Sequence, residues 1–213
     1  MRIVKTIAAI IGVAILGFGG LLAYESIDRE DQFFVRDAAP VDPNYLAAVE
    51  SWTPQESDFY EPTGIAAHRL KRAPGVVFGY RFYSNGSLNR IDDETYKKLT
   101  VWLVDGAPQV PVESRLGDTT RVLVIYSHGG SAWPERGCSG FVTTGSLRVT
   151  PSGKHVSVSV AGEFEPRGSR HKSSYCKAEH VEFSFEASEV TAAQLTPWLG
   201  REGTHPYDET YRR

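Results

Sequence analysis

The sequence predicts a mainly β protein: an antiparallel β-sandwich or barrel of six to eight strands, preceded by an N-terminal transmembrane helix and a short amphipathic helix. Three observations carry this prediction. Short segments between residues 76 and 187 alternate apolar and polar side chains with period two, and no helical segment separates them. A long uncharged apolar run stands at the N-terminus. The chain of 213 residues is 41% hydrophobic, which is enough apolar material for a core.

The N-terminal apolar run, IAAIIGVAILGFGGLLA at residues 7–23, carries no charge. At about 1.5 Å per residue, a helix over residues 1–24, with residues 3–24 in the membrane, is long enough to cross the bilayer core of roughly 30 Å. Arg2 and Lys5 precede the run and acidic residues follow it, so the positive-inside rule places the N-terminus in the cytoplasm. We therefore expect a single-pass protein of the inner (plasma) membrane, with the bulk of the chain periplasmic or extracellular. A cleaved signal peptide is the alternative, and it exports the same residues.

Residues 25–75 are expected to form a spacer with one short helix. Asp42 can serve as an N-cap and Pro43 suits the first helical position. Leu46, Val49 and Trp52 follow three residues apart, which indicates one apolar face. Proline and glycine then interrupt the rest of the segment.

The β-domain is expected to span residues 76–200, before a polar tail at residues 201–213. Its strands are predicted from six alternating segments: VVFGYRFYS, TYKKLTVWLV, TTRVLVIYS, GFVTTGSLRVT, HVSVSVAGEFE and EHVEFSFEA. Asn85-Gly86, after the first segment, predicts a tight hairpin, and PSGK, between the fourth and fifth, predicts a turn. The third segment is apolar on both faces, which favours a central position.

The chain has two cysteines, Cys138 and Cys176. In an oxidising compartment a pair of cysteines favours a disulfide over two free thiols. Each cysteine stands just before a strand-like segment, so we expect the bond to join two neighbouring strand ends.

Charge and motif content narrow the classes of partner. The net charge of −3 does not supply the positive face that phosphate binding needs, so nucleic acid is not an expected partner. The six histidines make none of the spacings that bind metals. We expect neither a metal nor a cofactor, and a small-molecule ligand is left open.

The stretch VLVIYSHGG at residues 122–130 resembles the strand and oxyanion-hole segment of lipases and esterases. This resemblance implies a serine nucleophile in a downstream G-x-S-x-G elbow, followed by an acidic residue and a histidine. The chain has no such elbow, and the residues after Gly130 are too few for the rest of that fold. We therefore interpret Val122–Tyr126 as a buried strand and Gly129-Gly130 as the start of a loop.

We expect the exported β-domain to be a binding or interaction module of the cell envelope that restrains or scaffolds another envelope protein. Five residues near the predicted disulfide and in a basic loop are the candidate partner contacts: His128, Trp133, Arg136, Arg167 and Arg170. The alternative is an exported hydrolase with a non-contiguous site. Such a site would combine His128 with the strand residues Glu163, Glu165 and His180, and convergence of a histidine, a carboxylate and a hydroxyl or thiol in one cleft would favour it.

Overall fold

The computed structural model describes the β-rich part of the chain. The described residues are 28–40, 70–85, 94–117, 121–130, 138–167, 176–191 and 194–195. The predicted transmembrane segment, the predicted amphipathic helix and the polar tail lie outside these ranges. Within them, no helix has the length and apolar character that crossing a membrane requires.

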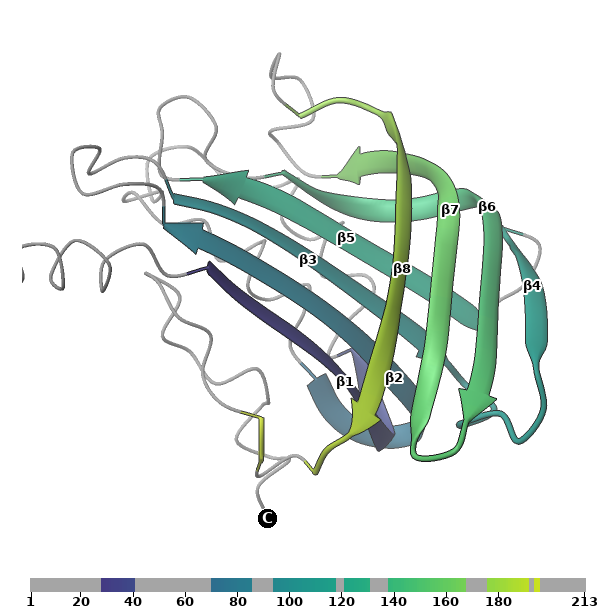
Figure 1. Ribbon diagram of the computed structural model, residues 1–213. Helices are drawn as coiled ribbons and strands as arrows, with labels where there is room; N and C mark the ends of the chain where they lie inside the picture. The colour runs from purple at the N-terminus through teal and green to yellow at the C-terminus, as the bar shows by residue number, and fades with distance from the viewer. Residues whose placement is uncertain are drawn as a thin grey trace, which may run out of the picture.

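The described residues form eight β-strands, which make one sheet in the order β4-β6-β5-β3-β2-β1-β8-β7 (Figure 1). Because β6 also pairs with β7, seven strands close into a barrel and β4 is an extra strand outside the ring. The strands are β1 (Asp28–Pro40), β2 (Leu70–Asn85), β3 (Glu94–Leu103), β4 (Val112–Leu116), β5 (Val122–Gly130), β6 (Cys138–Ser152), β7 (His155–Arg167) and β8 (Glu179–Glu189). Of the two predicted architectures, the barrel is the one observed.

Strand β6 makes the extra strand possible because it has two neighbours along one edge. Its first residues pair with β5, and its later residues pair with β4, while its other edge pairs with β7 throughout. The β6–β7 register shifts between Val142 and Thr144, where β6 leaves β5. Bulges bend strands and increase their twist. Gly145 follows at φ +136°, and a Cβ there would lie 2.1 Å from the Ala161 carbonyl oxygen.

The barrel closes along a parallel contact between β1 and β8, which we call the seam. A ring with an odd number of strands cannot alternate direction throughout, so one neighbouring pair must be parallel. The ladder covers two residue pairs. The backbone N–H of Val190 donates to the Phe34 carbonyl at 2.9 Å. Arg36 adds an ion pair with Glu189 at 2.7 Å, although both side chains are about half exposed.

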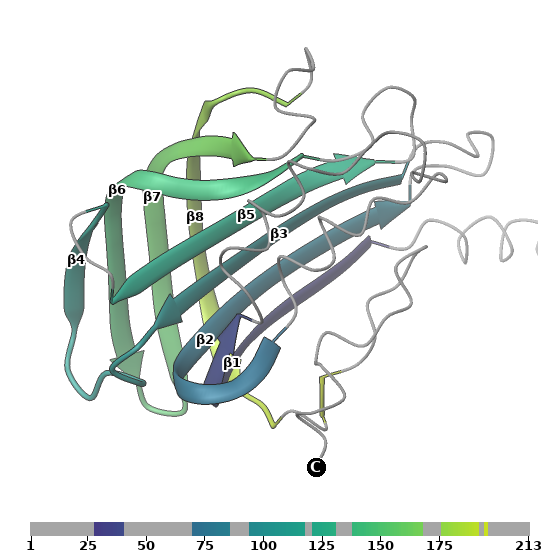
Figure 2. The same cartoon turned by 180° about the vertical axis from the view of Figure 1, so that it is seen from behind.

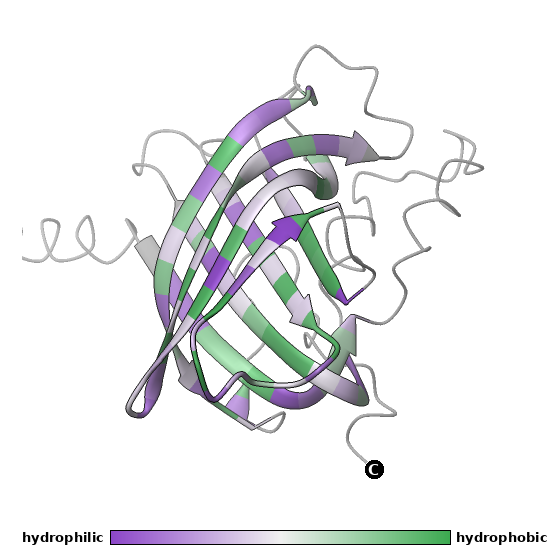
Figure 3. Cartoon of the chain, turned by 90° about the vertical axis from the view of Figure 1, so that its right-hand side faces the viewer, coloured by the Kyte–Doolittle hydropathy of each residue, from purple (hydrophilic) through white to green (hydrophobic). Residues whose placement is uncertain are grey.

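Inward-facing side chains of the seven strands form the main core. Alternate residues of each strand point inward, and Figure 3 shows the resulting alternation of hydrophobic and hydrophilic residues along the ribbons. Phe78, Leu99, Leu147 and Phe164 are the largest inward side chains with almost no exposure. The alternation predicted for the segments that became β2, β3 and β8 is confirmed, because one set of alternate residues of each strand lies in this core.

The outer face of β1, β2, β3 and β5 is buried as well, on the side turned to the viewer in Figure 2. Phe33, Val35, Val77 and Ile125 are nearly inaccessible although they point out of the barrel. These strands are therefore covered on both faces, as the sequence indicated for β5.

Two cations lie buried on this outer face. Arg81 and Lys98 are directly opposite each other on β2 and β3, and Arg81 pairs with Asp31 of β1 at 2.8 Å. Burial, and secondarily the neighbouring guanidinium, lowers the pKa of Lys98 to about 7. The sequence pattern does not predict a buried lysine, because alternating charges on a strand are typical of a solvated face.

Four boundaries differ from the sequence prediction. Residues 28–40 form β1 instead of a spacer, and β2 begins at Leu70, before residue 76. The segment Val112–Leu116 was not predicted as a strand but forms β4. Asn85 pairs with Glu94, so the predicted hairpin is present but the tight turn at Asn85-Gly86 is wrong. The PSGK turn is confirmed: Gly153, at φ +63°, lies between β6 and β7.

Candidate binding site at the mouth of the barrel

One end of the barrel carries the inward-facing side chains of His128 and Glu179, and we call this end the mouth. The carboxyl ends of β2, β5 and β7 meet the amino ends of β1, β3, β6 and β8 there (Figure 1). The described inward residues at this end are only partly covered: His128 and Glu179 keep 27% and 49% of their side chains exposed. Polar groups are therefore tolerated at the mouth without the cost of full burial.

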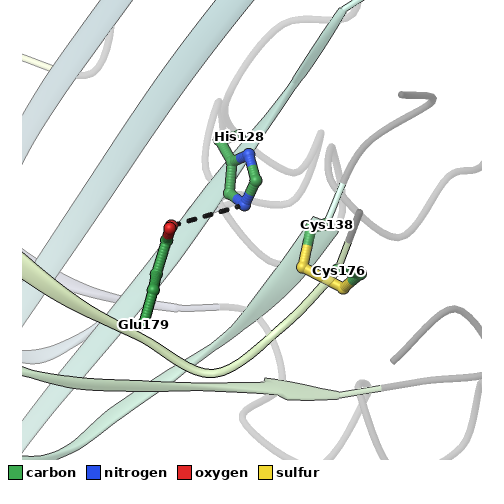
Figure 4. Close-up of a disulfide and its surroundings, with 4 residues drawn as sticks. All are labelled: His128, Cys138, Cys176 and Glu179. Atoms are coloured by element: carbon green, nitrogen blue, oxygen red, sulfur yellow. Dashed lines mark ion pairs between the residues drawn. A yellow bond between two sulfur atoms is a disulfide. The ribbon is translucent and has the colours of Figure 1, made fainter. Parts of the chain in front are cut away.

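His128 of β5 links two strands that are not neighbours in the sheet. Its Nε2 atom lies 3.7 Å from the Glu179 carboxylate of β8, as Figure 4 shows. The imidazole stacks on the Tyr126 ring with centroids 5.4 Å apart and meets the Phe164 ring nearly edge-on. Both His128 and Glu179 remain accessible, with 27% and 49% of their side chains exposed. The pair is an ion pair whenever the histidine is protonated.

Two tyrosines extend this aromatic cluster inward. The rings of Tyr126 and Tyr80 both contact the ring of Phe183, with centroids 5.3 and 5.6 Å apart. Burial raises the pKa of Tyr126, and the charge of Glu179 and the neighbouring Tyr80 raise it further. Burial likewise raises the pKa of Tyr80, followed by the charge of Glu30 and a hydrogen bond to that carboxylate. Both phenols therefore stay protonated and are able to donate hydrogen bonds.

The disulfide predicted from the sequence is confirmed and lies at the mouth. Cys138 and Cys176 are bonded, with their Cα atoms 5.2 Å apart, and both are buried. Cys138 is directly opposite His128 in the β5–β6 ladder. The bond fixes the start of β6 to the residues just before β8, close to the histidine–carboxylate pair (Figure 4).

The predicted partner contacts are only partly within the described residues. His128 is at the mouth, and Arg167 is the last residue of β7, where its backbone pairs with Ser139 near the same end. Trp133, Arg136 and Arg170 lie outside the described ranges. Gly129 and Gly130 still belong to β5, so the loop begins after them and not at Gly129.

The residues of the hydrolase alternative do not meet at one site. His180 and Glu163 face each other on the outside of the barrel, where Nδ1 and a carboxylate oxygen are 2.9 Å apart. Glu165 is on the same outer face of β7. His128 points to the inner face instead and pairs with Glu179. Among the described residues, no group of three or more histidine, cysteine or acidic side chains could hold a metal ion.

Sequence reasoning missed the inward carboxylates and tyrosines of the mouth. The alternation places Tyr80 on the inward face of its strand, which by itself indicates only a core position. A signal was present for Glu179, because it has the same strand parity as the inward residues Val181 and Phe183. A polar residue of inward parity at a strand end predicts a place at the rim of a barrel or sandwich.

The fold and the mouth define the class of the molecule: a disulfide-bonded, closed seven-strand β-barrel with one extra strand. Comparison with protein families, with curated proteins and with solved structures finds no match to this chain.

Proposed function

We propose that this protein is a membrane-anchored, exported binding module that contacts another cell-envelope protein through the mouth of its barrel. The charge asymmetry around the N-terminal apolar run supports the anchor and its orientation. The disulfide supports an oxidising compartment, because such bonds persist outside the reducing cytosol. The residues proposed to contact the partner are those of the mouth.

The observation that carries the proposal is the combination of accessible polar groups and fixed aromatic rings at the mouth. Protein interfaces concentrate their affinity in a few aromatic and charged residues that are held in place before binding. His128 and Glu179 are accessible, and the rings of Tyr126 and Phe164 hold the imidazole from two sides. The disulfide keeps the supporting strand ends together, so little order has to be gained on binding.

A hydrolytic site is supported less well by the same residues. His128 and Glu179 are residue types that can serve as a general base and as the carboxylate that orients it. The ring that stacks on His128 belongs to Tyr126, and the raised pKa of this tyrosine keeps its hydroxyl protonated and so a weak nucleophile. In a binding role, the protonated phenol of Tyr126 would act as a hydrogen-bond donor.

Site-specific photo-crosslinking in cells tests the proposal on the full-length chain. A photoreactive residue at Lys177, which is exposed just before β8, is expected to give one discrete protein adduct, and His128→Ala in the same chain is expected to weaken it by about tenfold. The matched control is a photoreactive residue at Lys154, which is exposed in the β6–β7 turn at the opposite end. Equal adducts from both ends, or no adduct from the mouth, would contradict a binding role for the mouth.

A further inference from the structure

A concave surface lies on the outside of the barrel, on the opposite face of the wall from the inward-pointing side chains of the mouth. It is a groove of about 610 Å³ formed by β4, β6, β7 and β8. Sites for small molecules in proteins typically measure roughly 300 to 1,000 Å³. β4, which continues the sheet beyond the closed ring, lines the groove with Glu113, Ser114 and Arg115.

The floor of the groove is made of small side chains on three neighbouring strands, β6, β7 and β8. Outward positions here are not filled by the bulky residues that strands favour; they are Ser146, Ser159, Ala161 and Ser184. Ser159 and Ser184 face each other across β7 and β8 with their Oγ atoms 3.3 Å apart. Ladders occupy both edges of β7, so its backbone N–H and C=O groups are used within the sheet. A ligand on this floor therefore meets hydroxyl groups.

Charged side chains border the floor, and their charges balance. The two arginines and two glutamates among the lining residues are Arg115, Arg148, Glu113 and Glu182. Glu113 and Arg148, opposite each other on β4 and β6, form an ion pair at 2.6 Å, and both remain largely exposed. The groove thus offers guanidinium donors, carboxylate acceptors and hydroxyl groups without a net charge.

We propose that this groove binds an uncharged oligosaccharide. A strongly charged ligand would require an excess of the opposite charge along the groove, and the four charged residues sum to zero. An extended peptide gains affinity by pairing its backbone with an open strand edge, whereas the floor strand β7 has none. A sugar chain carries hydroxyls that both donate and accept, which matches the mixed donors and acceptors of this surface. The inference concerns another face of the domain and does not depend on the role of the mouth.

Calorimetric titration of the full-length chain tests this assignment. The probes are the β-1,4-linked tetramer of N-acetylglucosamine, maltotetraose, and a sulfated tetrasaccharide as the charged comparison. Wild type is expected to bind one of the two neutral tetramers and to bind the sulfated one more weakly. Ala161→Tyr fills the groove and is expected to weaken neutral-sugar binding by about tenfold or more.

The matched control is Ser157→Tyr, on the same strand and the same outer face but outside the groove lining. Tyrosine is well accepted in strands, so both variants are expected to fold, which circular dichroism checks. The control is expected to keep wild-type affinity within about twofold. The inference is overturned if neither neutral sugar binds, if the sulfated probe binds more tightly, or if Ala161→Tyr binds like wild type. It is also overturned if Ala161→Tyr instead abolishes self-association of the chain in sedimentation, which would make the groove a contact between copies.

Discussion

Removal of the Cys138–Cys176 bond tests how the barrel is held together at its mouth. The perturbation is the double variant Cys138→Ala/Cys176→Ala, which leaves no thiol and places no new polar group in a buried position. The bond spans 38 residues of sequence and encloses the β6–β7 hairpin. In its absence the unfolded chain gains the freedom that this closed loop had removed.

The expected loss of stability follows from the length of the loop. For a separation of 38 residues, the chain-entropy relation gives about 13 cal/mol/K, which is about 3.9 kcal/mol at 25 °C. A domain of 150 to 250 residues shifts its Tm by about 2 to 4 °C per kcal/mol, so we expect a fall of about 8 to 15 °C. The loss acts on the unfolded state, so the dependence of the free energy of unfolding on urea should also steepen, because the uncrosslinked chain exposes more surface.

Urea denaturation of the full-length chain, followed by tryptophan fluorescence under non-reducing conditions, measures the free energy of unfolding and its dependence on urea. Wild type treated with a phosphine reductant is the matched control, because it loses the crosslink and keeps the sequence. The reduced protein and the double variant should agree within about 1 kcal/mol. A loss of stability below about 1 kcal/mol refutes the reasoning, as does the detection of two reactive thiols in non-reducing denaturant.

Three further predictions concern the stability of the folded domain. Gly145→Ala combines a positive φ with a Cβ only 2.1 Å from a carbonyl oxygen, so chemical denaturation should show a loss of about 2 kcal/mol or more. Phe164→Ala, at a fully buried ring, should cost about 3 to 5 kcal/mol, while Val110→Ser, at a side chain 66% exposed, should change stability by less than about 0.5 kcal/mol. Lys98 has a pKa of about 7 in the folded state against an ordinary value of 10.5, so between these values the unfolded chain binds a proton that the folded chain does not. Stability should therefore rise from pH 7 to pH 9 by up to about 1 kcal/mol per pH unit, and Lys98→Met should flatten that slope; an equal slope in the variant contradicts the assignment.

The strands that alternate, and the continuously apolar β5, were predictable from the sequence, whereas β1 and β4, which show neither pattern, were missed. In β1 the adjacent Phe33 and Phe34 are both buried, one outside and one inside the barrel, so the segment shows no period of two. In β4 the burial is partial along most of the strand, because it lies outside the closed ring. The sequence of Val112–Leu116 is accordingly polar and short, which is typical of a loop.

The choice of architecture and the arrangement of the mouth could not be predicted from the sequence, because both depend on contacts between residues far apart in the chain. A sandwich and a barrel can share the same alternating strands, and the choice was made by the contact of β1 with β8 across more than a hundred residues of sequence. The disulfide could be predicted because the chain has two cysteines and one possible pairing. The contact of His128 with Glu179 could not, because it joins strands that are neighbours neither in sequence nor in the sheet.

The seam has a consequence for solubility. If the two-residue ladder between β1 and β8 opens, each strand presents an unpaired edge, and such edges are templates for pairing with other chains and for aggregation. The Arg36–Glu189 ion pair joins the two strands at this place through groups that are costly to bury in an intermolecular sheet. We therefore expect the Arg36–Glu189 pair to oppose pairing of these edges with other chains as well as to help close the barrel.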